Sequence, residues 1–172
     1  MSRRDYPLRP YLPADARALR DLFAQSIEEL TQDDYEEEQR LAWIEQAADA
    51  EAFAKRLSGA VTLVVQIGGE HLGFGALKGN TVLDMLYVHP HHAREGIGAT
   101  LADALERLAA GRGAEAITAE ASETAVLFFE KRGYMPMQRS AIPVDDQWLT
   151  CTTMKKQLKA APKADTPQAG SK

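Results

Sequence analysis

Three short apolar runs in the middle of the chain place the strongest constraint on its fold. These runs, at 61–67, 72–77 and 81–88, are rich in Val, Leu and Ile, and glycines follow the first two. Apolar, β-branched runs bounded by turn residues predict strands joined by hairpins. The third run stops before Pro90, because proline cannot donate to a strand ladder and the residue before it avoids helical geometry. An antiparallel meander is therefore expected here.

The segments on either side of this meander add helices and further strands. Apolar residues at three- and four-residue spacing predict helices, and a return to β-branched or alternating runs predicts strands. The expected helices cover a stretch starting near Pro13, a region at 33–57 with a possible break near Asp49, and two segments at 96–112 and 122–132. The further strands are expected near 6–10 and at 115–119, 134–142 and 147–154.

Length and tail composition suggest how the chain is organised. With 172 residues the chain can bury one sizeable core but is short for two independent domains, so we interpret 1–158 as a single domain. The final stretch, 159–172, has no large apolar residue that would offset the entropy of ordering it. We therefore expect a disordered tail there.

Charge and cysteine content exclude several classes of protein. The net charge of −5 gives no basic footprint for nucleic acid, and no apolar stretch near the N-terminus predicts a signal peptide or a membrane span. Cys151 is the single cysteine, so no internal disulfide is possible and a cytoplasmic location is expected. His89, His91 and His92 flank a proline turn without a converging carboxylate, so we expect no metal site.

Two glycines, Gly96 and Gly98, lie between the end of the third run and a predicted helix. A helix start exposes unpaired N–H groups, and glycine lets a phosphate approach the backbone, so this turn suits a diphosphate. Arg94 offers a charged donor beside it. The alternative is a tight turn that binds nothing. A Rossmann fingerprint would need glycine in place of Leu101, and the preceding strands are antiparallel.

Two longer motifs resemble those of the GNAT acetyltransferase superfamily. The segment at 83–101 is similar to that family's cofactor-binding motif, and the segment at 121–134 is similar to its A-x-x-F-Y/F-E-x-x-G-F/Y motif. The resemblance implies an α/β fold of the α+β type, in which a mostly antiparallel mixed sheet of about seven strands is flanked by about four helices. The order of predicted elements over 4–158 agrees with it.

The resemblance also implies acetyl-CoA as co-substrate and a primary amine as acceptor. The backbone of Leu86 and Val88 would pair with the pantetheine arm like an added strand. Two positions depart from the family pattern, since Ala93 replaces a polar phosphate contact and Phe129 replaces the tyrosine that protonates the departing thiolate in many relatives. The cofactor-binding residues implied in this way are Leu86, Tyr87, Val88, Ala93, Arg94, Glu95, Gly96, Ile97, Gly98, Ala99, Phe129 and Lys131.

The catalytic candidates follow from the chemistry of the amine. An amine with a pKa of about 10.4 must lose a proton before it attacks, whereas a thiol with a pKa of about 8.5 leaves readily as thiolate. Asp84, in an apolar run, is the first candidate base, and Glu120 is the second. Tyr134 and Tyr87 are candidates for a hydroxyl near the sulfur. The competing interpretations are a solvent-facing Asp84 and a Tyr134 that belongs to the core.

Direct transfer in a ternary complex is the expected mechanism, because no base motif surrounds Cys151. Two alternatives stay open: a catalytically weak acyl-CoA sensor, and a structural domain whose glycine turn holds nothing. The acidic stretch at 33–38, near Trp43, either attracts a cationic acceptor or forms a solvated helix start. The acceptor's identity and the choice between monomer and homodimer are left open.

Overall fold

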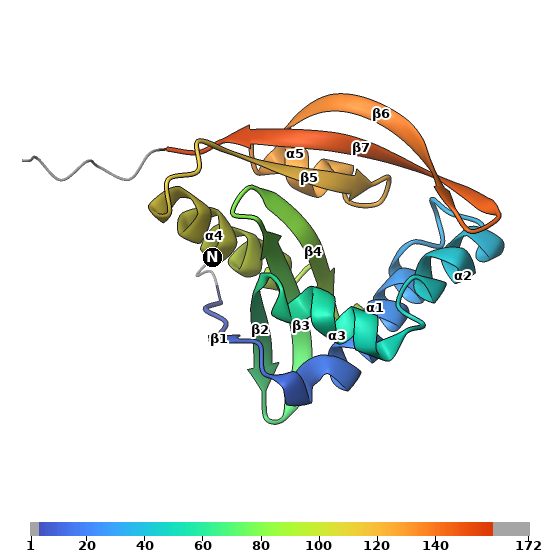
Figure 1. Cartoon of the computed structure of the whole chain (residues 1–172), viewed down its shortest axis with the longest axis horizontal. Coiled ribbons are helices and arrows are strands. Elements are labelled where there is room, and N and C mark those ends of the chain that lie inside the picture. Colours follow the sequence, from blue (N-terminus) through green and yellow to red (C-terminus); the bar gives the residue numbers. More distant parts are fainter. Residues whose placement is uncertain (1–3, 160–172) are drawn as a thin grey trace, which may run out of the picture.

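A seven-stranded mixed sheet organises the computed structural model, which describes residues 4–159 (Figure 1). The strand order is β1-β2-β3-β4-β5-β7-β6, and every neighbouring pair is antiparallel except β4 and β5. The strands are β1 (Leu8–Pro10), β2 (Val61–Ile67), β3 (Glu70–Lys78), β4 (Val82–Val88), β5 (Ala116–Ser122), β6 (Met135–Val144) and β7 (Gln147–Gln157). The predicted fold class, a mostly antiparallel mixed sheet, is confirmed.

Five α-helices cover the sheet in the described residues, one more than the sequence predicts. They are α1 (Ala16–Leu30), α2 (Glu37–Glu45), α3 (Ala50–Ser58), α4 (Ile97–Gly111) and α5 (Val126–Lys131), with 3₁₀ turns η1 (Pro13–Asp15) and η2 (Pro90–His92). The extra helix arises because the stretch at 33–57 is divided into α2 and α3. Asp49 caps α3, and its carboxylate accepts a hydrogen bond from the backbone of Ala52 at 3.0 Å. The expected tail at 159–172 lies, apart from Lys159, outside the described residues.

Helices pack on both faces of the β2–β4 meander because its strands are apolar on both faces. Phe23 of α1 and Phe53 of α3 share one buried cluster with Phe74 of β3. Leu101 and Leu105 of α4 are fully buried against the opposite face. The side chains of a strand alternate between its two faces, so the near-continuous apolar runs of the sequence match this sandwiched arrangement.

Glycine at position 73 brings α4 close to the sheet. A Cβ on Gly73 would lie 2.7 Å from Cγ2 of Ile97, the first residue of α4, and 3.3 Å from Cδ1 of Leu101. No side chain fits at such distances, so the absence of one on β3 lets the N-terminus of α4 rest directly on the strand.

The sheet opens between β4 and β5. Their parallel pairing is confined to Val82 with Thr118 and Leu83 with Ala119, both at the start of β4. Beyond Leu83 the two strands diverge, and Figure 1 shows β5, β6 and β7 set apart from the β1–β4 part of the sheet. The remainder of β4 is paired with β3 on one side and is left without a strand on the other.

Asp15 joins the N-terminal segment to the meander. It is 5% exposed, and its carboxylate accepts hydrogen bonds from both terminal nitrogens of Arg9 at 2.8 and 2.7 Å. Nε2 of His71, on β3, lies 2.9 Å from the same carboxylate, and the backbone N–H of Leu12 donates at 2.8 Å. The Arg9 guanidinium, helped by His71 and Leu12, holds the pKa of Asp15 well below its usual range.

We predict that Asp15→Asn lowers the free energy of unfolding by about 2 kcal/mol at pH 7, because buried groups lose a charged hydrogen-bond partner. A lowered pKa means that the ionised form stabilises the fold. This contribution is complete above the pKa of an unfolded aspartate, about 3.9, and is lost as the pH falls below it. Urea titrations at pH 7 and pH 2.5 measure this. The difference in free energy of unfolding between wild type and variant should be smaller at pH 2.5 than at pH 7. Asp21→Asn, on an exposed position of α1, is the control.

Candidate active site

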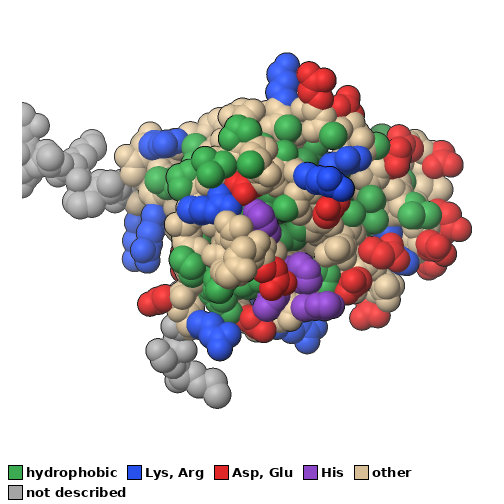
Figure 2. Space-filling model, turned by 90° about the horizontal axis from the view of Figure 1, so that it is seen from below, with side chains coloured by type: hydrophobic (Ala, Val, Ile, Leu, Met, Phe, Trp, Pro, Cys, Tyr) green, Lys and Arg blue, Asp and Glu red, His purple; other side chains and the backbone are tan. Residues whose placement is uncertain are grey.

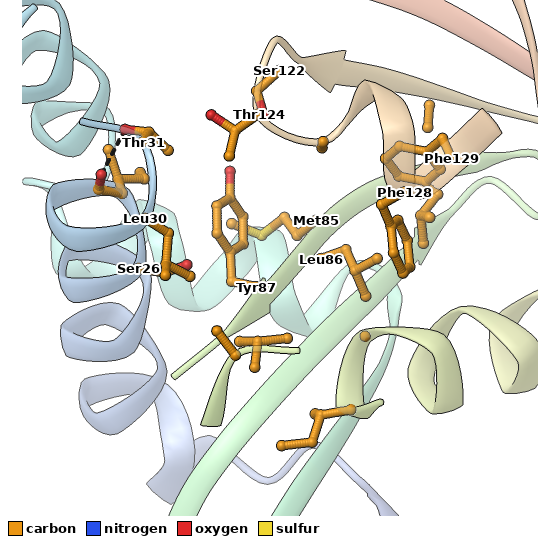
Figure 3. Close-up of a pocket in the computed structure, with 18 of the residues that line it drawn as sticks. Ser26, Leu30, Thr31, Met85, Leu86, Tyr87, Ser122, Thr124, Phe128 and Phe129 are labelled. Carbon is orange, nitrogen blue, oxygen red and sulfur yellow. Dashed lines mark hydrogen bonds between the residues drawn. The ribbon is translucent and has the colours of Figure 1, made fainter. Parts of the chain in front are cut away.

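A cavity of about 490 Å³ occupies the opening between β4 and β5 (Figure 3). Its walls come from five parts of the chain: α1, α2, β4, the turn that leads into α4, and the segment from β5 into α5. In Figure 3, Ser26, Leu30 and Thr31 lie on the α1 side and Phe128 and Phe129 on the α5 side, with β4 between them. The cavity therefore depends on the divergence of the two strands.

The glycine turn forms one end of this cavity. Arg94 and Gly96 adopt left-handed backbone conformations, with φ of 63° and 95°, and Gly96 is the residue before the first turn of α4. The first N–H groups of a helix have no intrahelical partner, so those of α4 are available at this wall. From this turn and the start of α4, six of the predicted residues line the cavity, namely Ala93, Arg94, Gly96, Ile97, Gly98 and Ala99.

Glu95 belongs to the same turn, but it is not among the residues that line the cavity. Its carboxylate lies 3.2 Å from the hydroxyl of Tyr6 and 3.3 Å from Nδ1 of His92, on η2. Both partners lie outside the cavity lining. The one negative side chain of the turn is therefore held away from the space where an anion would bind.

The free edge of β4 forms the floor of the cavity. Leu86, Tyr87 and Val88, for which cofactor binding is predicted, all line it. Phe129 also lines it from α5, together with its neighbour Phe128. A Cβ on Gly98 would lie 3.6 Å from the ring of Phe128 and 3.7 Å from Val88, at ordinary contact distance, so a side chain at this position would extend into the lining.

Asp84 lines the cavity but is already engaged. Its Oδ2 accepts from Nε of Arg56 at 2.7 Å and its Oδ1 accepts from Nη2 at 3.1 Å, so both carboxylate oxygens face one guanidinium. This hydrogen bonding raises the pKa of Arg56, which lies on α3. Neither oxygen of this carboxylate is therefore free of the guanidinium.

Glu120, on β5, is the second carboxylate in the lining. It accepts hydrogen bonds from the hydroxyl of Thr153 at 2.6 Å and from the thiol of Cys151 at 3.4 Å, and within residues 4–159 it makes no ion pair. Burial, together with the Glu120 carboxylate, raises the pKa of the Cys151 thiol to about 11. That thiol is therefore protonated at neutral pH and is no nucleophile.

Tyr134 and Lys131 are not brought to the cavity. Tyr134 is 1% exposed, its ring centroid is 4.9 Å from that of Phe129, and it is absent from the cavity lining. The structure thus places it in the core behind Phe129, which corrects its assignment as a catalytic hydroxyl. Lys131, at the end of α5, is exposed and also lies outside the lining. The side chain after this helix-ending glycine faces the core because it packs in one buried cluster with Leu105 of α4 and Ile117 of β5.

Several lining residues were not among the predicted site residues. They include Ser26, Ile27, Leu30 and Thr31 at the end of α1, Trp43 of α2, Met85 of β4, and Ser122 and Thr124 near the end of β5. The α1 residues belong to an apolar stripe that periodicity assigns to the core. Ser26, a buried hydroxyl within that stripe, is the one local signal that the stripe meets something other than apolar side chains.

The segment between α1 and α2 is bonded to the far side of the cavity. The hydroxyl of Tyr35 donates to the carbonyl of Thr150 at 2.6 Å and accepts from the backbone N–H of Glu123 at 2.9 Å. Thr124 also donates to a carboxylate oxygen of Asp34 at 2.7 Å. These bonds cross from the α1–α2 segment to β7 and to the turn after β5. Burial raises the pKa of Tyr35 to about 12, so its hydroxyl keeps the proton that it donates to Thr150. Together these hydrogen bonds close one side of the cavity.

Residues 4–159 contain neither a helix that could span a membrane nor a cluster of metal-binding side chains. No helix in this part of the chain is long and apolar enough to cross a bilayer. Likewise, no group of three or more His, Cys, Asp or Glu residues there is placed to hold a metal ion. The histidines at 89–92 instead contact one another, with ring centroids 5.0 and 5.7 Å apart, and Figure 2 shows histidines together on one face of the molecule.

Comparison with known proteins gives consistent matches. A family model described as "Acetyltransferase (GNAT) domain" matches residues 31–158. An uncharacterized N-acetyltransferase of Escherichia coli K12, YafP, is 25% identical over 143 residues, which are 83% of this chain and 90% of that protein. A GCN5-related N-acetyltransferase from Rhodopseudomonas palustris is 49% identical with a TM-score of 0.90, covering 92% of this chain and 99% of its own. The PaiA N-acetyltransferase of Thermoplasma acidophilum, solved with coenzyme A, is 18% identical with a TM-score of 0.70, over 90% and 99% of the two chains.

We predict that Tyr35→Phe lowers the free energy of unfolding by about 2 kcal/mol, since two partly buried backbone groups lose their partner. Denaturant unfolding of the purified chain measures this. The matched control is Tyr11→Phe, because the hydroxyl of Tyr11 makes no hydrogen bond with the rest of the described chain and its loss should change stability by less than about 0.5 kcal/mol. Equal effects of the two variants would contradict the role assigned to Tyr35.

Proposed function

Because the chain belongs to the GNAT acetyltransferase family, we propose that it transfers an acetyl group from acetyl-CoA to a primary amine, directly and in a ternary complex. One observation carries this proposal. A single cavity extends from the N-terminal turn of α4, along the free edge of β4, to the carboxylate of Glu120. A diphosphate-bearing thioester and an amine can therefore meet inside one space.

The turn before α4 suits the diphosphate. Its N–H groups, the positive end of the helix dipole and Arg94 all favour a negative ligand, and Gly96 and Gly98 leave the backbone open to it. Because Glu95 is bonded to Tyr6 and His92, its charge does not oppose the ligand. The replacement of a polar residue by Ala93 leaves this backbone binding intact. The coenzyme A complex of the T. acidophilum protein supports the assignment.

The edge of β4 suits an extended amide-containing chain. Beyond Leu83 its backbone groups have no strand beside them, and backbone pairing with Leu86 and Val88 would hold the pantetheine arm in the manner of an added strand. Phe128 and Phe129 supply an apolar wall on the other side. Bound there, the co-substrate supplies an acetyl group activated as a thioester.

Glu120 is the base that the geometry favours. It lines the cavity without a cationic partner in the described structure, whereas Asp84 is bound on both oxygens by Arg56. Thr153 and Cys151 fix the Glu120 carboxylate in place. We therefore assign to Glu120 the proton that the ammonium group loses before its nitrogen attacks the thioester carbon. The nitrogen then forms the new C–N bond, the C–S bond breaks, and the sulfur leaves with the electron pair as thiolate. The second proton of the nitrogen passes through water to this thiolate, so Phe129 needs no hydroxyl.

Acetyl-CoA binding tests the placement of the cofactor. We predict that Gly98→Glu weakens it by about 100-fold or more, because a carboxylate beside the diphosphate adds bulk and like-charge repulsion. The variant should fold, since its Cβ has room and glutamate is favourable in the first turn of a helix. Titration calorimetry with acetyl-CoA measures the affinity. Gly111→Glu, at the other end of α4 where a Cβ meets nothing within 4 Å, is the charge-matched control. Unchanged affinity of folded Gly98→Glu would refute this placement.

Two carboxylate variants test the base. We predict that Glu120→Gln lowers kcat by about 10²- to 10⁴-fold with little change in acetyl-CoA affinity, because general-base catalysis is lost. Asp84→Asn should lower kcat by less than about tenfold, since Asp84 is paired with Arg56 and takes no proton from the amine. Thiol release from acetyl-CoA in the presence of an amine gives both rates. The opposite order of effects would make Asp84 the base.

A further inference from the structure

The cavity has a second half, away from the turn of α4, which differs in its lining. We define this acceptor half by three apolar side chains, two aromatic ones and one carboxylate: Ile27, Leu30, Met85, Trp43, Tyr87 and Glu120. In Figure 3 the side chain of Leu30 extends toward Tyr87, and the ring of Tyr87 extends from β4 toward Thr124. Glu120 provides the one free carboxylate in this half.

The aromatic rings of the acceptor half are held in fixed positions. The ring of Tyr87 lies 4.7 Å from that of Phe23, 5.7 Å from that of Phe74 and 6.4 Å from that of Trp43. Trp43 is also held by Tyr35, at 5.6 Å. Burial raises the pKa of Tyr87 to about 12, so its phenol is neutral at physiological pH. Such a preformed aromatic wall suits an apolar group or a cation that lies over the face of a ring.

Two threonine hydroxyls on the cavity wall already have partners. Thr31 donates to the carbonyl of Ile27 at 2.6 Å, and Thr124 donates to Asp34 at 2.7 Å. Their protons are thus used within the protein and are not available to an acceptor. Among the residues that define the acceptor half, Glu120 is the carboxylate without a cationic partner in the described structure, so an ammonium group would pair with it.

Cationic side chains are missing from the acceptor half of the described structure. Arg94 is the one Lys, Arg or His in the cavity lining, and it belongs to the turn before α4. Arg56 is paired with Asp84. A carboxylate on the acceptor would therefore find no counter-ion in the lining of this half, and Glu120 would repel it.

We propose that the acceptor is a small primary amine with an apolar or aromatic body and no carboxylate. Its ammonium group lies at Glu120, and its body packs against Trp43, Tyr87 and Leu30. This inference rests on the proposed acetyl transfer and adds the class of its second substrate. Acidic side chains also gather around the α1 and α2 end of the molecule, which favours the approach of a cation (Figure 2).

A matched pair of amines tests the proposal. Phenethylamine and phenylalanine differ by a single carboxylate, so comparing them isolates the group that the cavity excludes. With the full chain and saturating acetyl-CoA, we expect kcat/KM for phenethylamine to exceed that for phenylalanine by about 30-fold or more. Spermidine and a short peptide with a free N-terminal alanine complete the panel. Equal rates for the matched pair, or a higher kcat/KM for phenylalanine, spermidine or the peptide, would overturn the proposal.

A charge placed in the acceptor half should shift this preference. Leu30 is half-buried at the end of α1, so Leu30→Lys adds an ammonium group to the lining. We expect the ratio of kcat/KM for phenethylamine to that for phenylalanine to fall by about tenfold or more. Leu12→Lys, at a 55%-exposed position outside the cavity lining, should leave the ratio unchanged. An unchanged ratio in folded Leu30→Lys would count against the assigned acceptor half.

Calorimetry with acetyl-CoA distinguishes a wrong acceptor class from a wrong proposed function. Wild type that binds acetyl-CoA but turns over neither phenethylamine nor a related arylalkylamine would overturn the acceptor class and leave the cofactor site standing. Wild type that does not bind acetyl-CoA would overturn the proposed function itself.

Discussion

The short parallel contact between β4 and β5 is the constraint on which the site depends. With only two residue pairs joined, the sheet stays continuous while its strands part over the rest of their length. If the pairing continued, the backbone of β4 would be used within the sheet and no cavity would exist. The segment at 31–39 limits the opening from the other side, since Tyr35, Asp34 and Gln39 bond to β7 and to the turn after β5.

Local signals in the sequence predict the part of the site that is built from residues close together in the chain. The run that ends before Pro90 and the glycines of the following turn lie within about 20 residues of one another, so β4 and the start of α4 were predicted together. Residues from α1 and α2 reach the cavity only through long-range packing, and no local pattern assigns Leu30 or Trp43 to it. The choice between Asp84 and Glu120 likewise required Arg56, which is 28 residues distant from Asp84 in the chain.

The two halves of the cavity recognise their proposed ligands by different means. The cofactor half relies on N–H groups of a turn and on a strand edge, which are insensitive to most side-chain changes, so Ala93 and Phe129 are compatible with binding. The acceptor half relies on side chains of α1, α2 and β4. A family that keeps the cofactor half and varies the acceptor half can change its acceptor while it retains one co-substrate. This is possible because function resides in the site and not in the fold.

The close approach of α4 to β3 at Gly73 has a consequence for binding thermodynamics. Since the first residue of α4 rests on strand backbone with no side chain between them, the amides of the turn are held in place before any ligand arrives. Little conformational entropy is then lost on association, and more of the interaction energy is retained as affinity. The strength of the proposed diphosphate binding would thus be set partly by a residue on β3 that is outside the cavity lining.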